Sequence, residues 1–183
     1  MSSTLIVGPS WVGDMIMAQT LFKRLKSQKP DQQIDVLAPR ASLPMASRMA
    51  EVSGIFEFDI RHGELGLAYR RSVAKKLSTG GYDRAIVLPN SLKSALVPFF
   101  AGIPTRTGFR GEYRYGLIND MRLLDKRRMP RMIDRFVALS ALVSSENKPP
   151  VFSEYPELMV DFDQRERLLD KFNLRARRPV VGL

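Results

Sequence analysis

The sequence contains no cysteine, a single histidine and no long apolar run. The absence of cysteine excludes a disulfide scaffold, a thiolate metal site and a cysteine nucleophile. One histidine excludes a multi-histidine metal site, and we expect no metal. No run approaches the roughly 18 apolar residues that a spanning helix needs, and a signal peptide is not evident at Met1. These absences predict a soluble cytoplasmic protein.

Basic residues, by contrast, are in excess: 29 Lys and Arg stand against 19 Asp and Glu, a net charge of +10. Between Arg106 and Arg135 nine basic residues stand against four acidic ones, which is half of that surplus. Such charge predicts either an ordinary solvated rim or attraction to an anion, such as nucleic acid, an anionic membrane or a phosphorylated substrate.

Short apolar runs alternate with segments of helical periodicity. We expect strands at 4–8, 34–38, 55–60, 85–88, 105–109 and 179–183, and helices at 14–26, 65–77, 90–101, 132–143 and 164–172. Continuous apolar strands between helices favour a doubly wound parallel sheet, an α/β domain covered on both faces. Because the chain ends inside an apolar strand-like run, we expect it to be the front part of something longer.

The first strand-to-helix turn, from Gly8 to Asp14, lies where ligands bind in open α/β sheets. Its Gly8-x4-Gly13 spacing resembles a phosphate loop, but Asp14 and Met15 replace the required Lys and Ser/Thr. A carboxylate at this point either stabilises the helix N-terminus or acts as a general base, and both roles are compatible. Trp11 is either a core residue or a pocket wall.

Two further loops carry polar groups after a strand. Asn90, Ser91 and Lys93 suit an anion or a sugar hydroxyl, although helix capping would explain Asn90 and Ser91 equally well. The segment from Gly108 to Gly116 mixes arginines, tyrosines and glycines, which suits phosphate binding or stacking on RNA.

These segments resemble the lipopolysaccharide heptosyltransferases of glycosyltransferase family 9, and most of all their ADP-heptose:lipopolysaccharide heptosyltransferase II type. The resemblance is carried by Leu5–Met15, Ile34–Pro39, Val87–Ser91, Lys93–Pro104, Arg106–Gly108, Arg110–Asp120, Leu124–Lys126 and, after a looser stretch, Arg178–Leu183. It implies a GT-B fold in which 1–178 form the N-terminal Rossmann-like acceptor-side domain. Residues 179–183 would open a C-terminal donor-binding domain, so a chain truncated there would lack activity alone or need a separate C-terminal polypeptide.

The resemblance also implies roles for individual residues. Asp14 matches the family's catalytic base, and Ser10, Trp11 and Gly13 match the loop that approaches the donor sugar. Asn90, Lys93, Arg106, Arg110 and Arg114 fall in acceptor-facing segments. The implied reaction transfers L-glycero-D-manno-heptose from ADP-heptose to heptosyl-Kdo-lipid A, with inversion, without a metal or other cofactor, at the inner leaflet of the inner membrane. The alternative is a non-catalytic basic module that binds phosphorylated lipid A or RNA; no RNA-binding motif supports it, and we expect no nucleic-acid partner.

Overall fold

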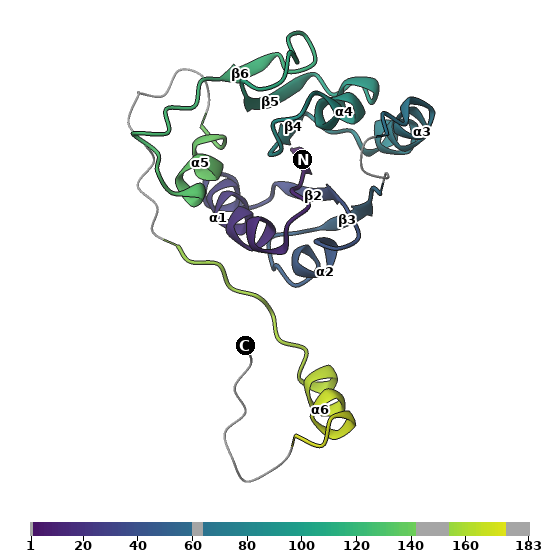
Figure 1. Ribbon diagram of the computed structural model, residues 1–183, viewed down its shortest axis with the longest axis vertical. Coiled ribbons are helices and arrows are strands. Elements are labelled where there is room, and N and C mark those ends of the chain that lie inside the picture. The colour runs from purple at the N-terminus through teal and green to yellow at the C-terminus, as the bar shows by residue number, and fades with distance from the viewer. Residues whose placement is uncertain (1, 60–63, 142–153, 175–183) are drawn as a thin grey trace.

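The computed structural model describes residues 2–59, 64–141 and 154–174. Its centre is one parallel sheet with the strand order β3-β2-β1-β4-β5-β6 (Figure 1). The strands are β1 (Ser3–Val7), β2 (Gln33–Ala38), β3 (Gly54–Glu57), β4 (Arg84–Val87), β5 (Thr105–Phe109) and β6 (Asp120–Arg122). The order confirms the predicted Rossmann-like doubly wound sheet.

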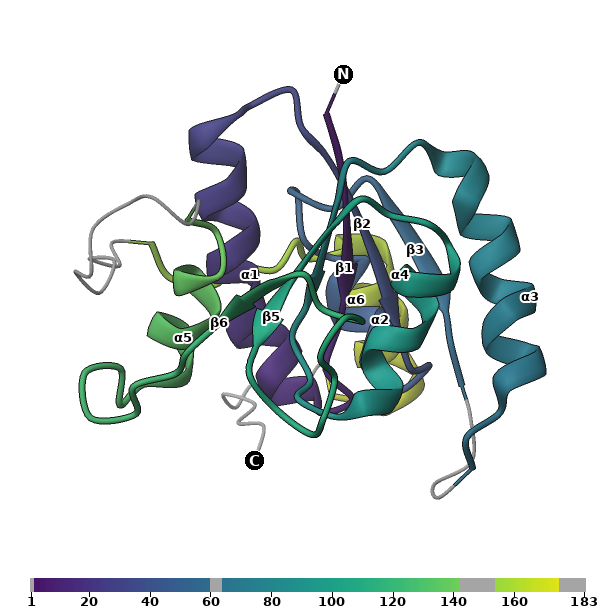
Figure 2. The same cartoon turned by 90° about the horizontal axis from the view of Figure 1, so that it is seen from above.

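Helices cover both faces of this sheet. They are α1 (Val12–Gln28), α2 (Leu43–Ala46), α3 (Leu67–Leu77), α4 (Leu96–Phe100) and α5 (Met132–Ala138), with 3₁₀ turns η1 (Ser78–Gly80) and η2 (Leu92–Ala95). The last helix, α6 (Phe162–Lys171), lies apart from the sheet (Figure 1). Figure 2 shows α1 and α5 on one side of the strands and α3 and α4 on the other.

The alternation of side chains along the central strand explains this two-sided cover. Ile6 of β1 points into the core under α1, where Phe22 is fully buried. Its neighbours Leu5 and Val7 point into the opposite core, where Val73 of α3 packs. A strand that is apolar on both faces is stable only between two helical layers, and β1 is buried throughout.

A polar contact ties the segment leading to α6 to the main domain. The buried amide of Gln19 on α1 donates to Glu51 Oε2 at 2.9 Å and to the Glu157 carbonyl at 2.7 Å, and its oxygen accepts from Glu157 N at 2.8 Å. Beyond it, α6 buries none of its side chains within the described structure.

Most element boundaries agree with the predictions within two residues, but the helix predicted to reach residue 143 ends at Ala138 and the strand predicted to reach residue 60 ends at Glu57. The expected helix over 90–101 is instead the 3₁₀ turn η2 followed by the short α4, because Pro98 has no N–H to donate to the Ser94 carbonyl and so prevents a continuous α-helix through that point. The elements α2 and β6 were not predicted. The strand expected at 179–183, residue 60 of the third predicted strand and residues 142–143 of the fourth predicted helix lie outside the described residues.

Candidate functional site

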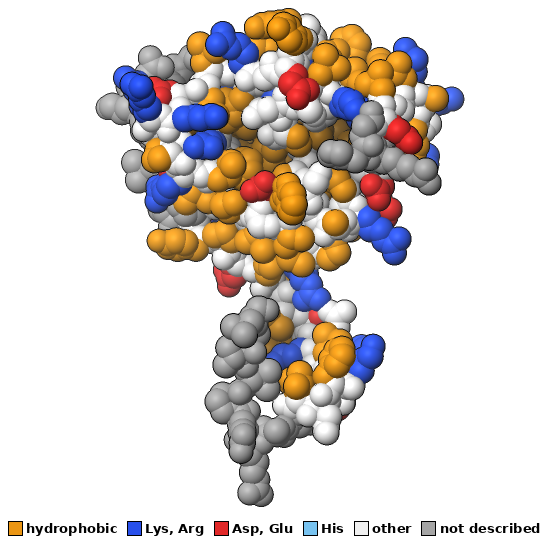
Figure 3. Space-filling view, in the orientation of Figure 1, with side chains coloured by type: hydrophobic (Ala, Val, Ile, Leu, Met, Phe, Trp, Pro, Cys, Tyr) orange, Lys and Arg blue, Asp and Glu red, His pale blue; other side chains and the backbone are white. Residues whose placement is uncertain are grey.

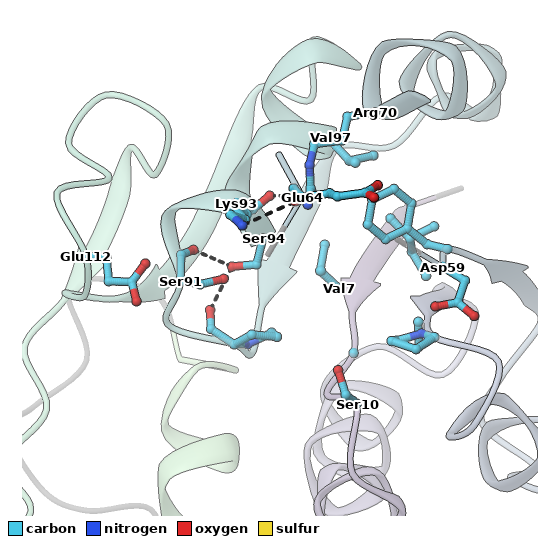
Figure 4. Close-up of a pocket in the computed structure, with 16 residues that line it drawn as sticks. Val7, Ser10, Asp59, Glu64, Arg70, Ser91, Lys93, Ser94, Val97 and Glu112 are labelled. Carbon is cyan, nitrogen blue, oxygen red and sulfur yellow. Dashed lines mark hydrogen bonds between the residues drawn. The ribbon is translucent and has the colours of Figure 1, made fainter. Parts of the chain in front are cut away.

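A pocket of about 440 Å³ lies at the carboxyl ends of the central strands (Figure 4). It is lined by the ends of β1 and β2, the segment after β3, the turn after β4 and the loop after β5. The lining residues are Val7, Gly8, Ser10, Leu37, Ala38, Pro39, Phe58, Asp59, Glu64, Arg70, Pro89, Ser91, Lys93, Ser94, Val97 and Glu112. Because β1 and β4 are neighbours whose connections leave in opposite directions, this is the switch point at which open α/β sheets bind ligands.

The chemistry of this lining is mixed. Its apolar members come mainly from strand ends, and its polar members are three serine hydroxyls, three carboxylates, one lysine and one arginine. Hydroxyls and carboxylates side by side donate and accept hydrogen bonds in several directions, which suits a polyhydroxylated ligand. A pocket for phosphate alone would not carry Asp59, Glu64 and Glu112.

The wall after β4 is the turn from Pro89 to Ser94. Ser94 Oγ lies 3.0 Å from the Pro89 carbonyl and 2.6 Å from the Ser91 carbonyl. Leu92 N donates to Glu112 Oε2 at 3.1 Å. Ser91 precedes η2 in an extended conformation, but its side chain caps nothing. Of the two roles left open for Ser91, side-chain capping is therefore excluded, and Glu112 of the neighbouring loop accepts from the Leu92 amide instead.

Arg70 is a pocket residue that the sequence did not reveal as one. It is buried, donates to the Leu65 carbonyl at 2.7 Å and to the Lys93 carbonyl at 2.8 Å, and lies over the Phe58 ring. Burial lowers the pKa of its guanidinium. One signal was available: Arg70 falls on the same helical stripe as the core residues Val73, Ala74 and Leu77 of α3.

Lys93 lines the pocket as well, and its Nζ donates to the Glu64 carbonyl at 3.2 Å. Arg110 follows β5 at the same carboxyl edge and is exposed, with its backbone N donating to the Arg122 carbonyl at 2.7 Å. These are the two predicted basic residues that the structure places at the pocket edge of the sheet.

The pocket lining does not include Arg106 or Arg114. Arg106 lies at the amino end of β5, the opposite edge, and donates to the Leu117 and Ile103 carbonyls at 2.6 Å each. Arg114 has no solvent exposure, and its Nη1 and Nη2 donate to protein oxygens. A high count of basic residues predicted attraction to an anion, but these two guanidiniums are used inside the fold.

Only the first part of the loop between β1 and α1 lines the pocket. Ser10 lines the pocket, whereas Trp11, Gly13 and Asp14 do not. Trp11 directly precedes α1 and its side chain is 77% exposed, which excludes the alternative that it is a core residue. Gly13 lies in open space, because a Cβ there would meet no atom within 4 Å. Asp14 lies half-buried in the first turn of α1, and its carboxylate forms no hydrogen bond or ion pair with any residue in 2–59, 64–141 or 154–174.

Two features are absent from the described part of the chain. None of its helices is both long and apolar enough to cross a membrane. No group of three or more His, Cys, Asp or Glu side chains that could hold a metal ion occurs among those residues.

A parallel sheet in this order, with a sugar-compatible pocket at its switch point, defines a Rossmann-like ligand-binding domain. A family model for glycosyltransferase family 9 (heptosyltransferase) matches residues 70–183. The chain belongs to this family.

Individual relatives agree with this assignment. The chain is 45% identical to lipopolysaccharide heptosyltransferase 2 of Escherichia coli, over 97% of this chain and 52% of the relative. It is 44% identical to lipooligosaccharide heptosyltransferase 2 of Haemophilus influenzae, with the same coverage. A solved structure of E. coli ADP-heptose LPS heptosyltransferase II superposes with a TM-score of 0.86 at 43% identity, covering 98% of this chain and 53% of that one. The chain thus spans about half the length of the relatives it matches.

Proposed function

We propose that this protein takes part in transferring L-glycero-D-manno-heptose from ADP-heptose to the heptose of the lipopolysaccharide inner core. Its family and the names of its relatives support heptosyl transfer as the reaction class. The observation that carries the mechanism is the loop from Gly8 to Asp14. This loop contributes to the pocket at the switch point and ends in a carboxylate that the described fold does not use.

In the proposed reaction Asp14 is the general base. Its carboxylate accepts the proton of the acceptor hydroxyl while that oxygen attacks the anomeric carbon of heptose. The bond between the anomeric carbon and the diphosphate oxygen breaks, and ADP leaves with the bonding electrons. A single displacement of this kind inverts the anomeric centre and needs no metal for the proton transfer.

The neighbouring residues have positioning and binding roles in this proposal. Ser10, Trp11 and Gly13 approach the donor sugar from the exposed loop. Lys93, the turn containing Asn90, and Arg110 face the acceptor, whose phosphates are anionic. The mixed pocket lining supports binding of heptose hydroxyls beside two cations, Arg70 and Lys93, since carboxylates and serines both hydrogen-bond to hydroxyl groups. We propose that most contacts to the ADP moiety come from a C-terminal domain, in the same polypeptide or in a separate one.

We also propose peripheral docking on the anionic cytoplasmic face of the inner membrane, where the acceptor lies. Lys126, Arg127 and Arg128 are consecutive exposed cations between β6 and α5. Figure 3 shows a face on which hydrophobic side chains gather toward the middle and Lys and Arg side chains lie mostly toward the rim. Each basic residue near an anionic surface adds about 1 kcal/mol of attraction.

Asp14→Asn tests the mechanism. The side chain keeps its size, and the described structure shows no hydrogen bond that the substitution would break, so the loss of stability should stay within the roughly 0.3–1 kcal/mol of a helix-dipole interaction. Transfer of heptose to purified acceptor, measured by mass spectrometry, should fall by about 10²- to 10⁴-fold. Asp31→Asn, an exposed carboxylate beyond the other end of α1, is the matched control and should retain full transfer.

Near-normal turnover of Asp14→Asn would refute the assignment of the base. If the unmodified protein transfers no heptose, alone or with a C-terminal domain supplied, the proposed function is wrong. Tight RNA binding that weakens steeply with salt would then favour the anion-binding alternative.

A further inference from the structure

The loop after β5 is hydrogen-bonded through Glu112 and Arg114 to the Pro89–Ser94 turn, which forms one wall of the pocket; we call these contacts the clasp. Arg114 Nη1 donates to the Pro89 carbonyl at 2.6 Å and lies 3.4 Å from Ser94 Oγ. Its Nη2 donates to Asn90 Oδ1 at 3.1 Å and to the Phe109 carbonyl. One planar guanidinium therefore joins the end of β5 to three residues of the turn, which a lysine ammonium cannot do from one position.

Backbone contacts complete this clasp. Glu112 N donates to the Asn90 carbonyl at 3.2 Å, and the Glu112 carboxylate accepts from Leu92 N. Gly111 permits this approach, because a Cβ there would lie 2.3 Å from the Asn90 carbonyl oxygen. The loop and the turn are thus packed backbone against backbone, and even one methyl group would force them apart.

The clasp is costly to build. Tyr113, beside Arg114, has a φ of 26°, a strained backbone conformation for a residue other than glycine. The guanidinium of Arg114 is fully buried, and its Nε has no hydrogen-bond partner in the described structure. Burial lowers its pKa, although the charge of Glu112 opposes that shift. The bonds to the Pro89 and Phe109 carbonyls and to Asn90 Oδ1 offset the cost of burying the charge, and loss of the guanidinium would leave these oxygens without their donor.

We propose that Arg114 is a positioning residue that fixes the Pro89–Ser94 turn, and with it Ser91, Lys93 and Ser94, in the geometry that binds the sugar acceptor. This inference rests on the proposed function. Three bonds from Arg114 end on the turn, whose other side lines the pocket (Figure 4). A ligand contact by Arg114 itself is not needed for this role.

Arg114→Lys tests the proposal, with Arg84→Lys as the matched control. Arg84 is a partly buried arginine that donates to the Leu139 carbonyl at 2.7 Å and to Thr107 Oγ1 at 2.9 Å. It lies at the amino end of β4, whereas the pocket lies at the carboxyl ends of the strands. Both variants should lose stability. Only Arg114→Lys should raise the acceptor KM, by roughly 10- to 100-fold, with a much smaller change in kcat. The reason is that a shift of the Pro89–Ser94 turn misplaces the side chains that bind the acceptor.

Hydrogen exchange of the protein without ligand gives a second readout. In Arg114→Lys the backbone amides of Leu92 and Glu112 should exchange faster than in the unmodified protein, while those of β1 should not. Gly111→Ala, which displaces the turn and leaves Arg114 intact, should reproduce both effects and serves if Arg114→Lys does not fold.

The outcomes separate the two proposals. If the unmodified protein transfers heptose and Arg114→Lys or Gly111→Ala keeps its acceptor KM, the inference is wrong and the proposed function stands. An equal rise in KM for Arg84→Lys would show that Arg114 acts only through general stability, and it would overturn the positioning role. If the unmodified protein transfers no heptose, the proposed function fails, and unchanged exchange at Leu92 and Glu112 would overturn the positioning role as well.

Discussion

The Tyr82 hydroxyl donates a 2.6 Å hydrogen bond to Asp35 Oδ2, and both side chains are buried between β2 and the start of β4. Asp35 has one further contact, a 3.4 Å bond from Gln33 Nε2 to the same oxygen, and its Oδ1 has no partner in the described structure. Tyr82→Phe would therefore remove the principal hydrogen bond of a buried carboxyl group.

We expect Tyr82→Phe to lower the free energy of unfolding by about 2–3 kcal/mol, since a hydrogen bond to a charged group contributes about 1.5–3 kcal/mol. For a protein of this size the melting temperature should fall by roughly 5–10 °C. In an Asp35→Asn background the same substitution should cost only about 1 kcal/mol, because the bond is then between neutral groups. Urea unfolding of the four proteins in this cycle measures the difference.

The pH dependence gives an independent check. Burial raises the pKa of Tyr82, and the hydrogen bond and negative charge of Asp35 raise it further. The folded state keeps the phenol protonated where an unfolded chain loses the proton, near pH 10. The stabilisation is thus complete below about pH 10 and declines as the pH rises from there, by up to about 1.4 kcal/mol per pH unit. Tyr82→Phe should lack this part of the decline.

Tyr69→Phe is the matched control, because Tyr69 is 42% exposed, and its cost should stay within about 0.5 kcal/mol. Equal costs of Tyr82→Phe in the two Asp35 backgrounds, or an unchanged alkaline decline, would refute the reasoning.

Two further predictions concern charge. Burial alone would raise the pKa of Asp120, but hydrogen bonds from Arg122 and Thr107 and the charges of Arg122 and Arg84 lower it overall. Its stabilisation should hold above about pH 4 and be lost as the pH falls below that value, so acid unfolding of Asp120→Asn should depend less on pH; an identical acid profile would contradict this. Replacing Lys126, Arg127 and Arg128 by Gln should weaken binding to anionic phosphatidylserine vesicles by roughly 100-fold at low salt, whereas replacing Arg24, Lys26 and Lys29 at the far end of α1 should not. Equal losses in the two triple variants would rule out a localised docking surface.

Most of the fold was predictable because four of its strands are short apolar runs that the sequence shows locally. The bounds of β5 at Thr105 and Phe109 agree with the prediction, and β1, β2 and β4 are within one residue. The missed elements have no local pattern: α2 is four residues long and contains Pro44, and β6 consists of Asp120, Met121 and Arg122. Pairing with β5 makes β6 a strand, and no periodicity reports such a long-range contact.

The site was predictable only where it follows a strand end. The rule that ligands bind beyond the carboxyl ends of strands pointed to the loop that contains Ser10 and to the turn that contains Lys93, and both residues line the pocket. It could not find Arg70 or Glu112, since tertiary packing brings these residues to the pocket. Charge counting also grouped Arg110 with Arg106 and Arg114, although Arg110 is exposed and the other two guanidiniums are bonded within the fold. The role of Asp14 stays a prediction.

The ends of the sheet have consequences for behaviour at high concentration. The outer strands β3 and β6 have only four and three residues, so each offers few free backbone groups to a strand from another molecule. At β6, the charged side chains of Asp120 and Arg122 make the edge unfavourable for a neighbouring strand. Edge-to-edge pairing of sheets from two molecules is therefore disfavoured at β6. If such aggregation occurs, it should begin at β3, where Ile55 and Phe56 are exposed.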